Sequence, residues 1–300
     1  MMAEYHDQDK LLEITNLIAQ SRRSQSFIFA GNKGIGKATA ARSLANNLLP
    51  STNDLLHNLL WIESESNIIT IEQVRKIKGF LGHTPHNDFY RVVVIDSVDD
   101  LNRNAANALL KILEEPPAQS VLILISHKPN HLLATIRSRC SIIRFTIPEN
   151  AQAILAEIEM ESKDKELTLR LAHNIPGIAV DLAANQALDW YKKTVQALLD
   201  DNNCRFVEEY FTDSSVQKWW LFSYLLQYLA EKTIKTACLG HHDNHLFPIE
   251  KDLIDKLTRD KPPKEWFMIY DRLLKLSEVT PKLHLDYKSA AITMIAEMRI

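Results

Sequence analysis

A glycine-rich loop between an apolar run and a helical pattern constrains this chain more than any other feature. Three of its seven glycines, Gly31, Gly34 and Gly36, lie close together. The apolar run Ser26–Ala30 precedes them, and a helical pattern begins at Lys37. Glycines let the backbone turn tightly and point its N–H groups inward, while the start of a helix adds partial positive charge. The sequence therefore predicts a phosphate-binding loop, with Lys37 reaching the outer phosphates.

One position of this loop departs from the pattern of nucleotide hydrolases. A Ser or Thr hydroxyl normally follows the lysine and binds Mg²⁺, but here the residue is Ala38. Thr39 comes one residue later, about 100° further around the helix, so it should point elsewhere, although it remains a candidate for nucleotide binding. A strand-to-helix turn that binds nothing is the alternative. Nucleotide binding thus fits the sequence better than Mg²⁺-dependent hydrolysis.

The first half of the chain alternates strand-like and helical segments. Strands rich in Val and Ile that alternate with helices indicate a mostly parallel sheet covered by helices on both faces. Such a sheet places its ligand crevice at the carboxyl ends of its strands. The expected strands are Ser26–Ala30, Leu60–Glu63, Val92–Asp96, Val121–Ser126 and Ile142–Thr146, and the expected helices are Lys37–Leu49, Ile71–Leu81 and Leu101–Glu115.

The second half is helical throughout. After about Pro148 the strand-like runs stop, one continuous helix is expected over Ile178–Asp200, and a polar interval follows at Asp200–Asn203. The aromatic-rich helix that begins near Val216 is expected to pack in a helix core or at a subunit interface rather than to stack on nucleic acid bases. The sequence predicts an α/β nucleotide-binding domain over 1–147, a small helical lid over 148–203 and a helical C-terminal domain over 204–300.

Composition limits the classes of function. The net charge of −3 argues against binding nucleic acid by bulk positive charge alone, although a local basic patch remains open. The three cysteines are widely spaced, which favours neither a disulfide framework nor a zinc site and indicates the cytoplasm. No apolar run has membrane-spanning length and the N-terminus does not resemble a secretory signal, so a soluble protein is expected.

An acidic residue ends the expected strand Val92–Asp96. Asp96 follows a run of apolar residues, and in proteins with this loop such a carboxylate supports Mg²⁺ beside the phosphates. A hydrolysing enzyme usually places a glutamate next, as a general base, but Ser97 stands there and cannot take up a proton near neutral pH. Asp99 and Asp100 are expected to cap the following helix and to lie in its first turn.

The stretch from Asp99 to Pro117 resembles a motif of a known protein family. It contains the run Asn107-Ala-Leu-Leu-Lys-Ile-Leu-Glu-Glu-Pro-Pro, and the blocks Ser126-His-Lys-Pro and Thr135-Ile-Arg-Ser-Arg-Cys follow it. Together these blocks resemble the AAA+ family and, within it, the delta-prime subunits of the bacterial DNA polymerase III clamp loader. The resemblance is strong over about residues 24 to 148 and weaker in the helical remainder.

By this resemblance Arg139 projects across a subunit interface toward ATP that a neighbouring subunit holds. An arginine there stabilises charge on the transferred phosphoryl group. On the residues alone, a structural arginine that pairs with an acid beside the last strand is the favoured alternative. Ser126 stands where hydrolysing members have a polar sensor, so contact with a phosphate or water is expected. Ile178 replaces the arginine that senses nucleotide in motor subunits.

The resemblance implies a largely non-hydrolysing subunit that supports ATP-dependent loading of the sliding clamp on primed DNA. Its helical C-terminal domain would support a ring, or collar, with motor and opening subunits. ATP binding by this chain stays open, Mg²⁺ is disfavoured, and the segment Leu49–Leu60 lacks the cysteines of the zinc module that many delta-prime subunits carry. The alternatives are an ATP-hydrolysing motor subunit of the same or another AAA+ assembly and a stand-alone DNA-binding module.

Overall fold

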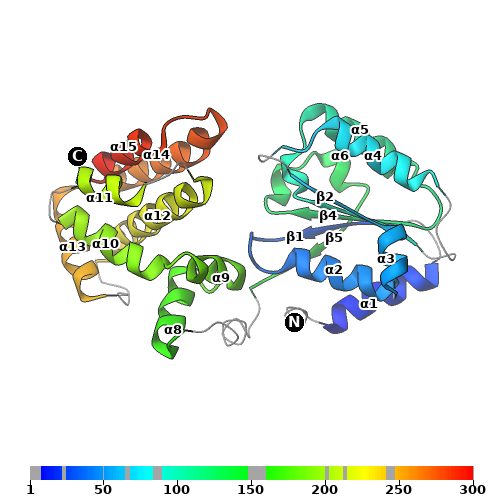
Figure 1. Cartoon of the computed structure of the whole chain (residues 1–300), viewed down its shortest axis with the longest axis horizontal. Coiled ribbons are helices and arrows are strands. Elements are labelled where there is room, and N and C mark those ends of the chain that lie inside the picture. Colours follow the sequence, from blue (N-terminus) through cyan, green and yellow to red (C-terminus); the bar gives the residue numbers. More distant parts are fainter. Residues whose placement is uncertain are drawn as a thin grey trace. The chain divides into compact units, whose positions relative to one another are not determined.

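A computed structural model describes residues 8–21, 25–49, 51–64, 68–83, 90–147, 160–199, 203–211, 215–240 and 247–299. The chain divides into two compact units, each described by itself: Met1–Ile154 with Ile175–Gly177, and Leu155–Asn174 with Ile178–Ile300 (Figure 1). The expected boundary at 147/148 borders residues that lie outside the described ranges. The expected boundary at 203/204 comes one residue after 200–202, which also lie outside them. The division into three domains therefore stays a prediction.

The first unit is built on a five-stranded sheet in the order β2-β3-β4-β1-β5, in which every neighbouring pair is parallel. The strands are β1 Gln25–Ala30, β2 Leu59–Glu63, β3 Arg91–Asp96, β4 Ser120–Ser126 and β5 Ser141–Arg144. All five expected strands are thus present, each within a residue or two of its predicted bounds. The expected parallel sheet is confirmed.

Helices cover both faces of the sheet because successive strand residues point to opposite sides. Val93 and Ile95 of β3 belong to one buried cluster, whereas Val92 and Val94 belong to the other. Helices α4 Ile71–Leu81, α5 Arg103–Glu114 and α6 Ala134–Arg137 contribute to the first cluster. Helices α1 Gln8–Ser21, α2 Lys37–Leu48 and α3 Thr52–Asn58 lie on the opposite face (Figure 1).

Three of these helices, α1, α3 and the four-residue α6, were not expected from the sequence. Helix α1 buries Leu11, Ile14 and Ile18, whose spacing is that of one helix face, inside an otherwise polar N-terminal segment. Helix α3 is short and starts at the cap Ser51, whose hydroxyl accepts a hydrogen bond from the amide of Asp54. The spacing of Leu11, Ile14 and Ile18 is thus a helical signal in the sequence, whereas the seven-residue α3 is too short for its apolar residues to form a pattern.

The second unit is made of helices only, within the part of it that the structure describes. They are α8 Ser162–Leu171, α9 Pro176–Ala184, α10 Ala187–Leu199, α11 Asn203–Tyr210, α12 Val216–Leu239, α13 Pro248–Asp260, α14 Pro263–Lys282 and α15 Tyr287–Arg299. The continuous helix expected over Ile178–Asp200 is wrong. The chain turns at Asn185 and Gln186, where Gln186 adopts a positive φ of 52°, and α9 and α10 are separate helices.

Aromatic side chains fill the core of the second unit. Trp219, Phe222 and Tyr228 of α12 are buried, which confirms the expectation of a packed core for this aromatic-rich helix. Next to them the fully buried carboxylate of Glu250 accepts a hydrogen bond from the hydroxyl of Tyr191 at 2.9 Å and pairs with Lys232 at 3.2 Å. In the described residues no helix is long and apolar enough to span a membrane.

Candidate functional site

The candidate site lies at the carboxyl ends of three adjacent strands, β3, β4 and β1. In the parallel register Ala30 is opposite Ser126, and Asp96 is opposite Ile125. The amide of Gly31 donates to the carbonyl of Ser126 at 3.2 Å, which joins the start of the glycine-rich loop to the end of β4. The sheet therefore brings the loop, Asp96 and Ser126 to one edge, as the sequence predicts for a ligand crevice.

The loop has the backbone that its glycines allow. Gly31, Gly34 and Gly36 have φ angles of 151°, 82° and 90°, a region that favours glycine. Gly36 is the N-terminal cap of α2, so the loop leads directly into a helix start. Between them the side chain of Ile35 is buried. The structure thus confirms the strand–loop–helix arrangement on which the predicted phosphate cradle depends.

The ammonium group of Lys37 turns back onto the loop. Its Nζ donates to the carbonyl of Gly31 at 2.7 Å and to that of Asn32 at 2.6 Å, and the residue is only 3% exposed. Burial lowers the pKa of Lys37 from 10.5 to about 8, while the nearby carboxylates of Asp96 and Asp99 oppose this shift. The lysine therefore satisfies its charge with the loop's own oxygens.

The residues around the loop do not fit Mg²⁺ well. Ala38 offers no oxygen and packs against the core on the α2 face of the sheet. Thr39 is the third residue of α2 and is partly exposed. Burial raises the pKa of Asp96, and the charge of Glu63 adds to this effect, while the charges of Lys37 and Lys33 oppose it. The site keeps a phosphate-cradle backbone without a complete metal-binding set.

Asp99 connects the ends of β3 and β4, a role that the sequence did not indicate. Its carboxylate accepts hydrogen bonds from the hydroxyl of Ser126 at 2.8 Å and from that of Ser97 at 3.0 Å. It also accepts from the backbone amides of His127 and Lys128. A phosphate or water would have to compete with Asp99 for the single hydrogen of the Ser126 hydroxyl, the group expected to act as a sensor.

The expected capping role of Asp99 is therefore wrong. The cap of α5 is Asn102, whose side-chain oxygen accepts from the amide of Ala105 at 2.9 Å. Asp99 lies instead in a 3₁₀ turn over Val98–Asp100. The residues next to Asp99 in the sequence give no signal of a partner on another strand. Its contacts with residues 126–128 arise because β3 and β4 are neighbours in the sheet.

His127 is a second residue of the site that sequence reasoning did not single out. Burial lowers its pKa from 6.5 to about 4, the charges of Lys37 and Lys33 lower it further, and Asp99 opposes them. Its Nδ1 is buried and has no hydrogen-bond partner among the described residues. The imidazole is therefore neutral near neutral pH, so the positive charge at this edge comes from Lys33 and Lys37.

Arg139 lies at the other end of the sheet from the loop. It precedes Ser141, which pairs with Phe27, four residues before Gly31 along β1. At a rise of about 3.3 Å per residue, Ser141 and Gly31 are separated by about 13 Å along the strand direction. The guanidinium donates from Nη2 to Glu114 at 2.7 Å and from Nη1 to the carbonyl of Thr135 at 3.0 Å. The structure thus separates Arg139 from the cradle of its own chain.

Comparisons with known proteins agree with this fold and these motifs. Residues 7–149 match the family described as "DNA polymerase III, delta subunit". The chain is 35% identical over 145 residues to the DNA polymerase III subunit delta' of Pseudomonas aeruginosa, a match that covers 42% of this chain and 44% of that protein. It is 25% identical over 298 residues to the subunit delta' of Bacillus subtilis, covering 90% of this chain and 88% of that protein.

A solved structure supports the fold over nearly the whole length. A DNA polymerase III gamma subunit-related protein from Thermotoga maritima superposes with a TM-score of 0.57 at 20% identity, covering 96% of this chain and 98% of that one. With the parallel sheet, the glycine-rich loop and the sequence matches, this defines an AAA+ fold with a helical C-terminal region. Over residues 7–149 the chain is similar to clamp-loader proteins of the AAA+ class, and its sequence relatives include DNA polymerase III delta-prime subunits.

Replacing Asp99 by alanine is expected to loosen the end of β4. The hydroxyl of Ser126 and the amides of His127 and Lys128 would lose a charged acceptor, at a cost of about 2–4 kcal/mol. Urea unfolding would report the loss, and faster hydrogen exchange of the two amides would locate it. Asp100→Ala is the matched control and should change stability by less than about 0.5 kcal/mol. Equal effects of the two substitutions would contradict the anchoring role.

The low pKa of His127 predicts a pH dependence of stability. In the unfolded chain the imidazole takes up a proton as the pH falls below about 6.5, whereas in the folded chain it does so only near 4. Stability is therefore lost as the pH falls from 6.5 towards 4. His127→Gln removes this contribution, so the variant should lose less stability than the wild type between pH 7 and pH 4.5. Parallel losses in both proteins, measured by urea unfolding, would refute this prediction.

Proposed function

We propose that this protein is a delta-prime type subunit of a DNA polymerase III clamp loader that hydrolyses little or no ATP itself. It supports ATP-dependent loading of a sliding clamp on primed DNA by motor and opening subunits. It donates Arg139 to the ATP site of a neighbouring motor subunit. The observation that carries the proposal is the separation of Arg139 from the phosphate cradle of its own chain, at opposite ends of the same sheet.

The cradle supports the non-hydrolysing part of the proposal. Ala38 and Ser97 stand where a metal-binding hydroxyl and a general base are needed. Lys37 spends two of its three donors on the carbonyls of Gly31 and Asn32, so a nucleotide phosphate would have to displace them. No catalytic step on a nucleotide held by this chain is assigned, because the residues that would perform it are not present.

The location of Arg139 supports its use in trans. The residue is partly exposed, with 34% of its side chain accessible, and lies on the side of the sheet where β5 begins. A guanidinium that cannot reach its own loop can still meet a phosphate that another subunit presents. Arginine is suited to this because its charge is permanent and its planar fork matches phosphoryl oxygens. The ion pair with Glu114 agrees with the structural alternative as well, so turnover of the assembly must decide.

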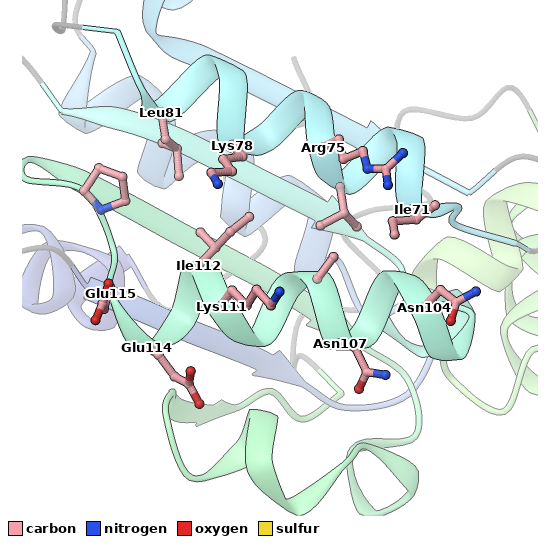
Figure 2. Close-up of a pocket in the computed structure, with 13 residues that line it drawn as sticks. Ile71, Arg75, Lys78, Leu81, Asn104, Asn107, Lys111, Ile112, Glu114 and Glu115 are labelled. Atoms are coloured by element: carbon pink, nitrogen blue, oxygen red, sulfur yellow. The ribbon is translucent and has the colours of Figure 1, made fainter.

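A basic groove on the first unit supports contact with DNA. Helices α4 and α5 enclose a groove of about 730 Å³ that Lys78 lines from α4 and Lys111 from α5 (Figure 2). Its apolar floor includes Val74 and Ile112. Within the part of the chain that the structure describes, neither lysine has an ion-pair partner. In the lining of the groove the three cations of Arg75, Lys78 and Lys111 outnumber the two carboxylates of Glu114 and Glu115. A surplus of positive charge beside an apolar floor is suited to a DNA phosphate backbone, despite the acidic net charge of the chain.

Arg139→Ala should lower ATP turnover of the assembled clamp loader with clamp and primed DNA by at least about tenfold at the neighbouring site. The reason is that the guanidinium stabilises charge only as the phosphoryl group is transferred. Intact assembly would be checked by size-exclusion chromatography. Unchanged turnover in an intact assembly would rule out the arginine donation and leave a scaffold role or a site of the chain's own.

The isolated chain separates the proposal from the alternative of a hydrolysing motor subunit. Measurable ATP hydrolysis by the purified wild type, abolished by Lys37→Ala, would favour the motor subunit. Absence of turnover in both proteins, together with the loss caused by Arg139→Ala in the assembly, supports the proposed subunit. Binding of primed DNA by the isolated chain, weakening as salt rises, would instead favour a stand-alone DNA-binding module.

The double substitution Lys78→Ala/Lys111→Ala should weaken binding of primed DNA by the assembled complex several-fold and reduce the slope of log K against log salt by about 1–2. Fluorescence anisotropy at several salt concentrations would measure both. The matched control is Lys76→Ala, an exposed lysine of α4 that does not line the groove. If the double variant and the control behave alike, DNA does not lie in this groove.

A further inference from the structure

The guanidinium of Arg139 is held from two sides. Its Nη2 donates to Oε1 of Glu114, and its Nη1 donates to the carbonyl of Thr135, with a weaker contact to the hydroxyl of Ser138 at 3.4 Å. Thr135 and Ser138 belong to the same short segment as Arg139, whereas Glu114 comes from the end of α5. A residue distant in sequence therefore fixes where this arginine lies.

A cation near Glu114 stabilises its carboxylate at the end of α5. Glu114 is the last residue of α5 and one of the residues that line the groove between α4 and α5 (Figure 2). The end of a helix carries partial negative charge from its unpaired carbonyls, so a carboxylate there is unfavourable by itself. Arg139 relieves this repulsion and gains a charge-assisted hydrogen bond in return. The pair is therefore a matched local arrangement rather than a chance contact of two long side chains.

The contacts of Arg139 leave part of its donor set free. A guanidinium has five N–H donors in a fixed plane. The contacts to Glu114, Thr135 and Ser138 occupy three of them, which leaves Nε–H and one N–H of Nη2. Two donors of one rigid fork are enough to contact a phosphoryl group. The arginine is thus oriented while it keeps donors for a ligand.

We propose that Glu114 is a positioning residue for Arg139, and that it keeps the guanidinium oriented for the phosphoryl group of the neighbouring subunit. This inference rests on the proposed function. Without Glu114 the long side chain would sample many rotamers, and part of the transition-state stabilisation would be spent on ordering it. The effect falls on the chemical step, because the arginine acts on charge that develops only there.

Stability of the chain is not the purpose of this pair. Half of the Glu114 side chain is exposed, at 50%, and so is about a third of that of Arg139. Exposed ion pairs contribute little to folding, because solvent screens them and two side chains must be ordered. Substitution of Glu114 should therefore leave the thermal midpoint of the isolated chain nearly unchanged. A functional loss without a stability loss separates positioning from a structural role.

The test measures ATP turnover of the assembled complex with clamp and primed DNA for wild type, Glu114→Gln, Arg139→Ala and the double variant. The Arg139-dependent turnover is the difference between wild type and Arg139→Ala. Glu114→Gln should lower it about three- to fivefold through kcat, with the KM for ATP changed less than about twofold. In the Arg139→Ala background the same substitution should have no further effect. The control Glu166→Gln, an exposed glutamate of α8 that does not line the groove, should match the wild type.

The outcomes distinguish this inference from the function on which it rests. If Arg139→Ala changes nothing, the arginine donation itself fails. If Arg139→Ala abolishes turnover but Glu114→Gln matches the control, the donation stands and the positioning role is refuted. Faster turnover in Glu114→Gln would also overturn the proposal, because it would show that the carboxylate restrains the arginine. An equal loss in the Arg139→Ala background would show that Glu114 acts without Arg139.

Discussion

Parallel pairing of β1 with β4 is the constraint on which the rest of the first unit depends. With Ala30 opposite Ser126, the loop that follows β1 and the turn that follows β4 must begin side by side. The hydrogen bond from Gly31 to Ser126 continues this pairing beyond the strands. A sheet buried on both faces cannot slip by one residue, because every side chain would change face. The geometry of the cradle is therefore a consequence of the register of the core.

Charges at this edge are balanced by the chain itself. Lys37 is solvated by loop carbonyls, and Asp99 is surrounded by two hydroxyls and two amides from residues 97 and 126–128. In a site that works on nucleotides, an anionic ligand and its metal would take part in this balance. Here the carboxylate of Asp99 accepts hydrogen bonds from the donors at the end of β4. The fold can thus keep the shape of a nucleotide site without depending on a nucleotide for its stability.

The sequence predicted the elements whose signal is periodic and long. The Val- and Ile-rich strands and helix Ile71–Leu81 lie where expected, because burial on one or both faces produces a regular pattern of apolar residues along the sequence. Breaks inside helical patterns were harder to see. The turn at Gln186 lies within Ile178–Asp200, a stretch that carries no Gly or Pro, so one long helix was predicted there.

The sequence predicted those parts of the candidate site that are formed by contiguous motifs. The glycine-rich loop follows one strand that the alternating pattern predicts and Asp96 ends another, and their location at one edge follows from parallel pairing. The contacts of Asp99 with the end of β4, and of Glu114 with Arg139, join residues more than 20 positions apart. Nothing in a single sequence marks two such residues as partners, since Asp and Glu near helix ends usually have local roles.

The two ends of the sheet have a consequence for symmetry. One end carries the cradle and the other carries Arg139, so the surface that would give an arginine differs from the surface that would receive one. Two copies related by a twofold axis could join them only if both surfaces lay within one patch, since each copy would then give an arginine and receive one. Contacts between unlike surfaces are heterologous, and repeated they close into a ring or continue as a spiral. The direction of the strands thus sets a head-to-tail order on any assembly that uses this arginine.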